Sequence, residues 1–434
     1  MTDFVNKVVD AVHKAKSHIH EGAHDLARVK KDKDVKLNDP CVDVTVKFTS
    51  ASGIPKMDVV GSADPYFVAK INDNVSMVST VKSRSLTPEW NEIWRVKNVP
   101  KTSELSVKVL DKDTDAPRHD DYIGKFKTSI DAGVKEGTFR LEIETTPSID
   151  PAEPRYLFDG PIRYSRHFSP TVGRLTNLDD ARLYSTWKMY LVGVPIYFGD
   201  VFQHWNVDYK AAQSIFGSGP TSLTIRASIH AGHKMLYARS TSNGFGIIES
   251  AEDVMRLFED ERPSNPDKDQ LETKEEVDTT VVPTKESLVT HRIKPAVYTY
   301  IISGEDDSLR FSETGAAFFV DFASKHALHA NCAEQVRYSG ELHLRPRAKD
   351  GSWCGWQGFD DSMPDASVNW EVLIDNNSGT YSPDKAMLPT LKALIDRNFP
   401  GLGVLALDRE DEELKNSVDA CRDYEQKYRG VKTD

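Results

Sequence analysis

Two acidic turns hold the side chains of this chain that are best suited to bind a metal ion. The first turn lies in Lys56–Tyr66 (KMDVVGSADPY) and the second in Val109–Gly124 (VLDKDTDAPRHDDYIG), and stretches with a strand-like alternating pattern flank both. Their aspartates are Asp58, Asp64, Asp111, Asp113 and Asp121. Calcium takes about six to eight oxygen ligands, carboxylates above all, in a flexible geometry. The pattern therefore predicts a calcium site formed by two loops.

The strands around these turns follow the pattern of a known family. The stretches CVDVTVKF, SADPYFVAKI, LTPEWNEIWRV and ELSVKVLDKD, all within Cys41–Thr145, together resemble a C2 domain. The resemblance implies an all-β sandwich that binds calcium and phospholipid. It places Asp58 and Asp64 in the first ligand loop, Asp111 and Asp113 in the DxD of the third loop, and Asp121 in its DxxG.

The third loop departs from the commonest family pattern in one respect. The stretch from Asp113 to Asp121 is longer by about two residues. Asp120 could therefore replace Asp121 as a ligand, and Asp115 is a further candidate. Some C2 domains lack these aspartates and only bind proteins, so a calcium-independent sandwich is the alternative. Because every acidic position is filled here, we favour calcium binding.

Bound calcium would convert these loops into a membrane-binding surface. The ion reverses the acidic field and offers coordination positions to phosphate oxygens. Met57, Val59 and Val60 flank the first loop and are placed to enter the headgroup boundary, while Arg118 lies in the mainly polar third loop. We expect anionic phospholipid, phosphatidylserine first, as the partner. The basic residues Lys82, Arg84, Arg95 and Lys97 are better explained as a solvated strand face than as a phosphoinositide site.

The composition of the whole chain restricts the other partners and the location. A formal charge of −12 argues against nucleic-acid binding, which requires a basic surface. The four cysteines form no CxxC, and the amino terminus lacks a charged leader followed by an apolar core. The apolar stretch around Trp187–Phe198 is too short to cross a bilayer. We therefore expect a cytoplasmic, peripheral membrane protein that associates with membranes when calcium is high.

The segments before and after the C2 pattern suggest a multidomain chain. We divide it into residues 1–39, an amphipathic helix at Val5–His20 with a basic linker; 40–146, the C2 domain; 147–155, a linker; and 156–434, a mixed α/β (α+β) domain. The amino-terminal helix could lie in a membrane interface, but docking on the protein body is the favoured interpretation. A charged stretch near 260–290, rich in proline, is expected to be a disordered acidic insertion.

In the first half of the α/β domain the patterns predict mostly helices. Tyr184–Phe216 is expected to be helical with an interruption at Pro195, Ser222–Arg239 to be a long strand or hairpin, and Gly246–Glu261 to be helical. In the second half, Ala316–His329 is expected to be a helix. Strands are expected at Ala296–Ser303, Leu309–Ser312 and Val336–Leu344.

A strand, helix and strand follow at Trp370–Ile374, Lys385–Arg397 and Gly403–Leu407, with a charged helix at the end of the chain. This spacing predicts a βαβ unit with at least one parallel strand pair. Both strands end in aspartate, Asp375 and Asp408, and ligands of open α/β sheets bind at the carboxyl ends of strands. The tentative ligand loop is Asp375, Asn376, Asn377, Ser378 and Asp408. Ordinary turn chemistry explains the same residues and is the favoured alternative.

Other polar groups give weaker signals. His326, His329 and Cys332 are spaced like metal ligands, but no second pair completes a zinc set, so core or solvated histidines are favoured. Arg337, Glu341, His343 and Arg345 alternate on one strand and are expected to face solvent rather than a polar pocket.

The C-terminal part looks like a fungal family that accompanies C2 domains, to which no activity can be attached. Whether the chain is an enzyme is left open. The alternatives to membrane recruitment are a metal-dependent hydrolase of a lipid or phosphoester, or a membrane-associated scaffold that binds a protein partner.

Overall fold

The computed structural model describes residues 40–56, 63–72, 74–112, 121–135, 138–149, 154–168, 185–237, 240–259, 293–314, 324–360 and 363–429. The predicted amino-terminal helix, the insertion near 260–290 and much of both calcium loops lie outside these residues. In the described part, no helix is long and apolar enough to cross a bilayer.

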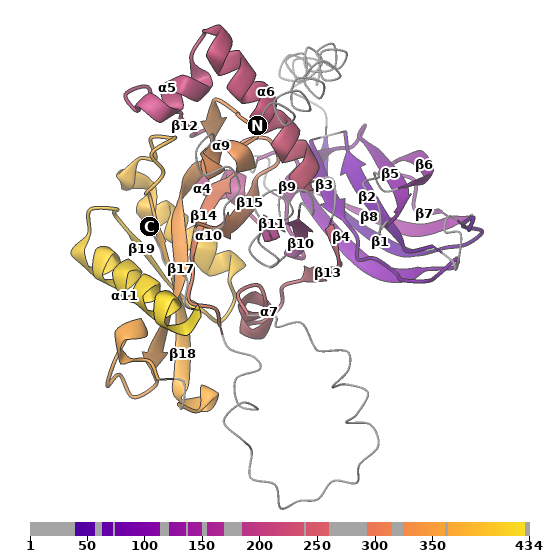
Figure 1. Ribbon diagram of the computed structural model, residues 1–434. Helices are drawn as coiled ribbons and strands as arrows, with labels where there is room; N and C mark the ends of the chain where they lie inside the picture. The colour runs from indigo at the N-terminus through magenta and orange to yellow at the C-terminus, as the bar shows by residue number, and fades with distance from the viewer. Residues whose placement is uncertain are drawn as a thin grey trace, which may run out of the picture.

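The amino-terminal part is a sandwich of two antiparallel sheets (Figure 1). One sheet has the order β7-β8-β1-β4-β9 and the other β3-β2-β5-β6. Apolar side chains alternate along β1 and β4 and meet those of β2 and β5 in one core that includes Phe48, Phe67, Trp90 and Trp94. The expected all-β fold is confirmed. The strand bounds are β1 Cys41–Ala51, β2 Pro65–Ile71, β3 Val75–Val78, β4 Glu89–Pro100, β5 Glu104–Asp111, β6 Asp121–Ser129, β7 Val134–Lys135, β8 Phe139–Pro147 and β9 Leu157–Phe158.

The carboxy-terminal part is built on an eight-stranded sheet of order β13-β10-β11-β15-β14-β17-β18-β19. Only β18 and β19 run parallel within this sheet as described, and α10 (Leu388–Asn398) connects them, so the predicted βαβ unit is confirmed. The other pairs are antiparallel. The strand bounds are β10 Arg163–Phe168, β11 Ser185–Tyr190, β13 Ser240–Ile247, β14 Val297–Ile302, β15 Ser308–Glu313, β17 Tyr338–Ala348, β18 Val368–Asp375 and β19 Gly403–Leu407.

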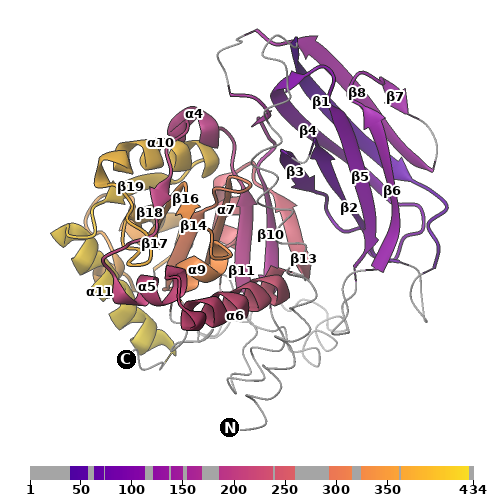
Figure 2. The same cartoon turned by 90° about the horizontal axis from the view of Figure 1, so that it is seen from above.

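The two faces of this sheet differ in chemistry. Tyr298, Tyr300 and Ile302 of β14 point to an apolar face that α4 (Val194–Phe198), α7 (Ala251–Arg256) and α10 cover. Helices α5 (Lys210–Phe216), α6 (Pro220–Tyr237) and α9 (Lys325–His329) cover the opposite face at one end, and α11 (Glu412–Arg429) covers it at the other. Figure 2 shows α4 and α10 on one side of the strands and α5 and α6 on the other. Many buried polar side chains lie on this second face.

Three sequence predictions for this part are corrected. Ser185–Tyr190 is strand β11 and not helix, because Trp187 and Met189 alternate into the apolar core. The strand or hairpin expected at Ser222–Arg239 is instead helix α6 (Pro220–Tyr237) in its described part. Ile229, Gly232 and Leu236 bury one helical stripe, which overrides the β-branched composition. Of the helix expected at Gly246–Glu261, α7 (Ala251–Arg256) is the helical part within the described residues 246–259.

Several shorter elements complete the description. They are β12 (Gln203–His204), which pairs with β16 (Gln335–Val336), and the single turns η3 (Trp356–Gly358), η4 (Asp365–Ser367) and η5 (Lys385–Met387). Of the helix expected at 316–329, α9 is the described portion, and residues 315–323 lie outside the description.

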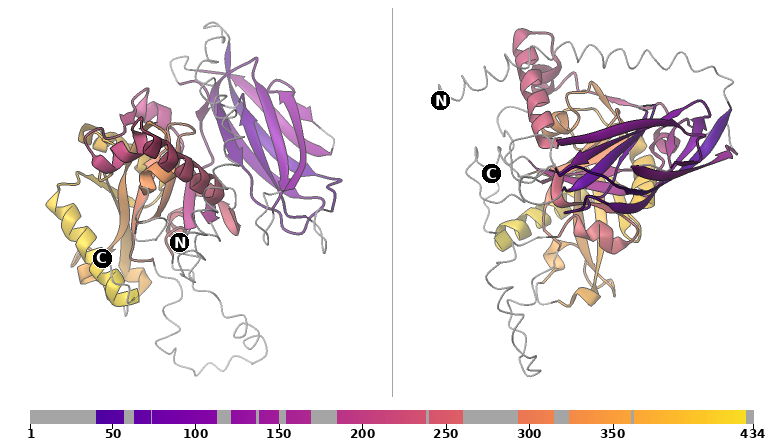
Figure 3. Two further views of the ribbon diagram at one scale, coloured as in Figure 1. Left: turned by 45° about the horizontal axis from the view of Figure 1, so that its top comes forward. Right: turned by 90° about the vertical axis from the view of Figure 1, so that its right-hand side faces the viewer.

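A short connection joins the sandwich to the α/β part (Figure 3). Residues 156–160 run along β4, where Arg95 donates its backbone N–H to Gly160 O (2.8 Å) and β9 pairs with the strand. Immediately beyond, the Arg163 guanidinium on β10 contacts the Glu92 carboxylate on β4 at 2.5 Å. Both side chains are buried, so an ion pair inaccessible to water ties the two parts together. The domain boundaries drawn from the sequence stay a prediction.

Candidate functional site

The first candidate site lies at one end of the sandwich. Asp111 is the last residue of β5, and it pairs across the sheet with Asp121, the first residue of β6. On its other side Asp111 pairs with Pro65 of β2, the residue that follows Asp64. The Asp64 backbone N–H donates to Asp111 Oδ1 at 2.6 Å, and the Arg84 N–H donates to Asp64 Oδ1 at 2.6 Å. Three aspartates that are far apart in the sequence thus lie at the ends of three adjacent strands.

The remaining predicted residues of this site cannot be placed. Asp58, Asp113, Asp115 and Asp120 lie outside the described residues, as do the predicted membrane contacts Met57, Val59, Val60 and Arg118. Within the described ranges, no three His, Cys, Asp or Glu side chains form a metal-binding group. The donor set at Asp64, Asp111 and Asp121 fits calcium, because it consists of hard carboxylate oxygens without imidazole or thiolate. When bound there, calcium would supply positive charge at an otherwise acidic surface.

The second candidate site surrounds Asp375 at the carboxyl end of β18. Asp375 is 2% exposed, and its Oδ1 accepts backbone N–H groups from Glu341 (2.7 Å) and Asn377 (2.8 Å). The Asn377 side-chain amide donates to Glu341 Oε2 at 2.9 Å, so this one residue contacts both acids. Gly340 permits the close approach, since a Cβ there would lie 2.1 Å from the Asp375 carbonyl oxygen.

Burial sets the protonation of Asp375. The pKa of its carboxyl is raised to about 7, chiefly by desolvation; the charges of Glu341 and Asp408 also act to raise it, and the two N–H bonds act to lower it. A carboxyl group that exchanges its proton near neutral pH can act as a general acid or base. Glu341 is therefore a member of this site that the sequence analysis missed. Its alternation on β17 was the available signal.

The predicted ligand loop does contact Asp408, but its polar groups are used in hydrogen bonds within the protein. Asn376 Nδ2 donates to Asp408 Oδ2 at 3.2 Å, and Asn376 Oδ1 accepts the Arg409 N–H at 2.7 Å. Ser378 Oγ accepts the Tyr381 N–H. The helical turn that follows is capped by the Asp384 carboxylate, which accepts the Ala386 N–H. Since the chain's own carboxylate caps this helix start, the start is not open to an anion.

The strand face expected to meet solvent is buried instead. His343 bonds Ser417 of α11 (2.8 Å), Arg345 pairs with Glu371 (2.6 Å), and Arg337 pairs with Asp307 (2.9 Å). The prediction was wrong because helices distant in the sequence cover this face.

His326 and His329 are buried and bonded within the protein, as expected for core histidines. His326 Nε2 bonds the Gly340 carbonyl oxygen at 3.0 Å, and His329 Nε2 bonds Ser312 Oγ at 2.8 Å.

Comparison with known proteins agrees with the sandwich geometry. The C2 domain family model matches residues 42–143. Human RasGAP-activating-like protein 1 is 37% identical over 89 residues, which are 20% of this chain and 11% of that protein. Elicitor-responsive protein 3 of Oryza sativa subsp. japonica is 25% identical over 143 residues, which are 33% of this chain and 93% of that protein.

Among solved structures, a C2 domain of plant Extended Synaptotagmin 1 is similar, with 25% identity and a TM-score of 0.23, covering 26% of this chain and 98% of that one. The chain thus spans about a tenth of the length of RasGAP-activating-like protein 1 but nearly all of the rice protein. The resemblance of the C-terminal part to a fungal family stays a prediction.

Proposed function

We propose, from the C2 domain at residues 42–143, that this protein binds anionic phospholipid in a calcium-dependent manner and thereby brings its α/β part to a membrane surface. C2 domains as a family bind phospholipid, commonly with calcium. The observation that supports the finer proposal is the position of Asp64, Asp111 and Asp121 at adjacent strand ends on one end of the sandwich. Without calcium this end would repel an anionic surface; with calcium it would attract one.

The proposed ligands extend this described set into the flanking loops. Asp58, Asp113 and Asp115 would complete the coordination, with either Asp120 or Asp121 closing the third loop. Met57, Val59, Val60 and Arg118 would contact the lipid. The location that follows is the cytoplasm, with peripheral membrane association when calcium is high, and phosphatidylserine as the first lipid to test.

The hydrolase alternative rests on the second site. That alternative needs the oxygens of Asp375 and Asp408 to hold magnesium. Both oxygens of Asp408 and one of Asp375 already accept hydrogen bonds from the protein. A protein partner of the α/β part remains a prediction, and recovery of a specific protein with the membrane-bound chain would test it.

Co-sedimentation of the full chain with vesicles tests the proposal. We expect the protein to pellet with phosphatidylserine-containing vesicles in calcium, and to stay in the supernatant with chelator or with neutral vesicles. The double variant Asp111→Asn with Asp113→Asn should lose the calcium effect, because two carboxylate ligands are removed. Its thermal transition in chelator should stay close to wild type.

Asp131→Asn is the matched control, since Asp131 follows the opposite end of β6 and pairs only with Lys101 among the ion pairs described. It should pellet like wild type. Calcium-dependent pelleting of the double variant would refute the ligand assignment.

A further inference from the structure

A buried hydroxyl group on the polar face of the large sheet lacks a hydrogen-bond partner. Thr186 of β11 is 0% exposed, and its Oγ1 forms no hydrogen bond within the described chain. Nearly all buried polar atoms in proteins are paired, and an exception calls for a water, an ion or a ligand. Ser339 of β17 is a second such hydroxyl, also 0% exposed. The two differ in their surroundings.

Polar side chains from four other elements, β10, β15, α6 and α9, surround Thr186. It pairs in register with His167 of β10 and with Ser312 of β15, so all three side chains point to the same side of the sheet. Ser312 Oγ bonds His329 Nε2 at 2.8 Å, and His329 Nδ1 bonds Tyr237 Oη at 3.1 Å. The Tyr237 ring lies 5.1 Å from the His167 ring, so the series of contacts around Thr186 returns to His167. Ser339, in contrast, faces Ile301 in an apolar cluster.

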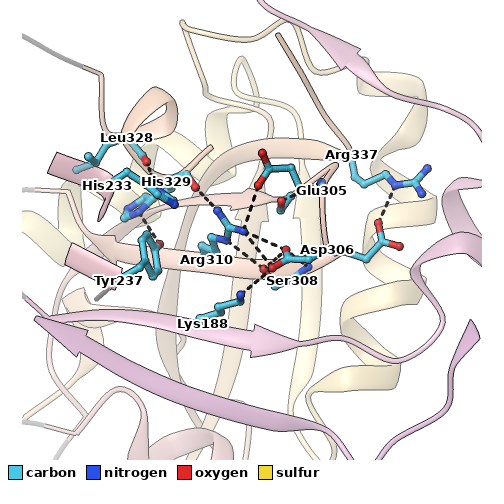
Figure 4. Close-up of polar contacts among 12 residues, drawn as sticks. Lys188, His233, Tyr237, Glu305, Asp306, Ser308, Arg310, Leu328, His329 and Arg337 are labelled. Atoms are coloured by element: carbon cyan, nitrogen blue, oxygen red, sulfur yellow. Dashed lines mark hydrogen bonds and ion pairs between the residues drawn. The ribbon is translucent and has the colours of Figure 1, made fainter. Parts of the chain in front are cut away.

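Two cations lie beside this group of side chains, with one largely buried carboxylate between them. Lys188 and Arg310 are register partners next along β11 and β15 (Figure 4). Asp306 accepts from Lys188 Nζ at 2.7 Å and from Arg310 Nη2 at 3.1 Å. The other nearby acid, Glu305, is 57% exposed and 3.9 Å away, so solvent screens it. The buried groups therefore carry an excess positive charge.

The neighbouring imidazoles respond to that charge. The pKa of His233 is lowered to about 3, mainly by burial and next by the charge of Arg310. The pKa of His329 is also held well below its usual value by burial and then by Lys325 and other cationic neighbours. Both rings are thus neutral at pH 7. A negative group that entered here would meet the Thr186 hydroxyl and the net positive charge of the group formed by Lys188, Arg310 and Asp306.

We propose that the face around Thr186, between β10, β11 and β15 and under α6, binds a small oxyanion, the phosphate group of a phosphomonoester. Thr186 Oγ1 donates one hydrogen bond to it, and the net positive charge of Lys188, Arg310 and Asp306 together supplies the opposite charge. The site is separate from the C2 loops and from Asp375, and it does not depend on the calcium proposal. The phosphate group belongs either to a soluble metabolite or to a lipid headgroup.

Thermal unfolding and isothermal titration of the full chain in chelator test this site. The probes are inorganic phosphate, glycerol 3-phosphate and a short-chain phosphatidic acid below its micelle concentration, against sodium chloride at equal ionic strength. We expect a saturable rise of Tm with phosphate and none with chloride. Tighter binding of glycerol 3-phosphate than of the lipid would assign a soluble ligand, and the reverse would assign a headgroup.

Thr186→Val removes the hydroxyl at nearly constant volume and should weaken phosphate binding by about tenfold or more, as expected for a lost hydrogen bond to a charged group. Ser339→Ala removes the other unpartnered hydroxyl and should bind phosphate like wild type. If Thr186→Val does not fold, Thr186→Ser keeps the hydroxyl and should retain binding. No saturable phosphate response in wild type, or equal binding by wild type and a folded Thr186→Val, would overturn the proposal.

Discussion

Asp375→Asn removes a charge that the fold keeps almost entirely from water. The asparagine Oδ1 can still accept the backbone N–H groups of Glu341 and Asn377, so the loop geometry is retained. What changes is proton binding. In wild type, burial raises the pKa of Asp375 from 3.8 to about 7. The variant has no proton to exchange at this position.

The sign of the effect follows from the raised pKa. The folded protein binds the Asp375 proton more tightly than the unfolded chain does, so this stabilisation is fully present below pH 3.8 and is lost as the pH rises to about 7. At about 1.4 kcal/mol per pKa unit, the whole change is about 4 kcal/mol. Between about pH 5 and pH 8 it amounts to about 2.5 kcal/mol. Asp375→Asn should therefore gain stability relative to wild type by that amount over this interval.

Urea unfolding at several pH values measures this difference directly. Other groups also titrate, for example His326, whose pKa is lowered to about 4 mainly by burial, so that its stabilisation is lost as the pH falls. These contributions are common to both proteins and cancel in the difference. Parallel stability curves for wild type and variant would show that Asp375 is ionised throughout, and the reasoning from burial would be wrong.

Asp408→Asn is the matched control within the same loop. The pKa of Asp408 is lowered, chiefly by the Glu410 N–H bond, so its stabilisation is present at high pH and is lost as the pH falls. The Asp408 variant should therefore lose stability relative to wild type as the pH rises in the acid range, below about pH 5, and should run parallel to wild type between about pH 5 and pH 8, unlike Asp375→Asn. Equal slopes for the two variants would contradict the assignment.

Two further substitutions test how the parts are held. Glu92→Gln leaves the Arg163 guanidinium buried without its carboxylate and should lower the free energy of unfolding by about 3 to 5 kcal/mol. The double change Glu92→Leu with Arg163→Met should recover much of this loss. Equal losses in the single and double variants would refute a buried-charge penalty. Gly340→Ala places a methyl group against the Asp375 carbonyl oxygen and should lower Tm markedly. In the control variant Gly124→Ala the methyl group meets nothing within 4 Å, so Tm should change little. Similar Tm values for the two variants would contradict the close packing at Gly340.

Local patterns were sufficient to predict the sandwich and the βαβ unit. Alternating apolar residues in β1, β4 and β5 specify strands with one buried face, and that information lies within a few neighbouring residues. The same holds for β18, α10 and β19, whose strand ends were correctly expected to carry Asp375 and Asp408. The sequence likewise predicted the acidic residues of the C2 loops as potential calcium ligands.

The tertiary structure decided which polar residues are buried and which of them meet. The sequence shows that Glu341, His343 and Arg345 share one side of a strand, but α11 and α9 determine that this side is covered. Helix α6 was mistaken for a strand because its buried stripe depends on what packs against it. The raised pKa of Asp375 likewise comes from packing, since desolvation depends on atoms contributed by distant segments. Residue types and their period are local properties, whereas burial belongs to the assembled fold.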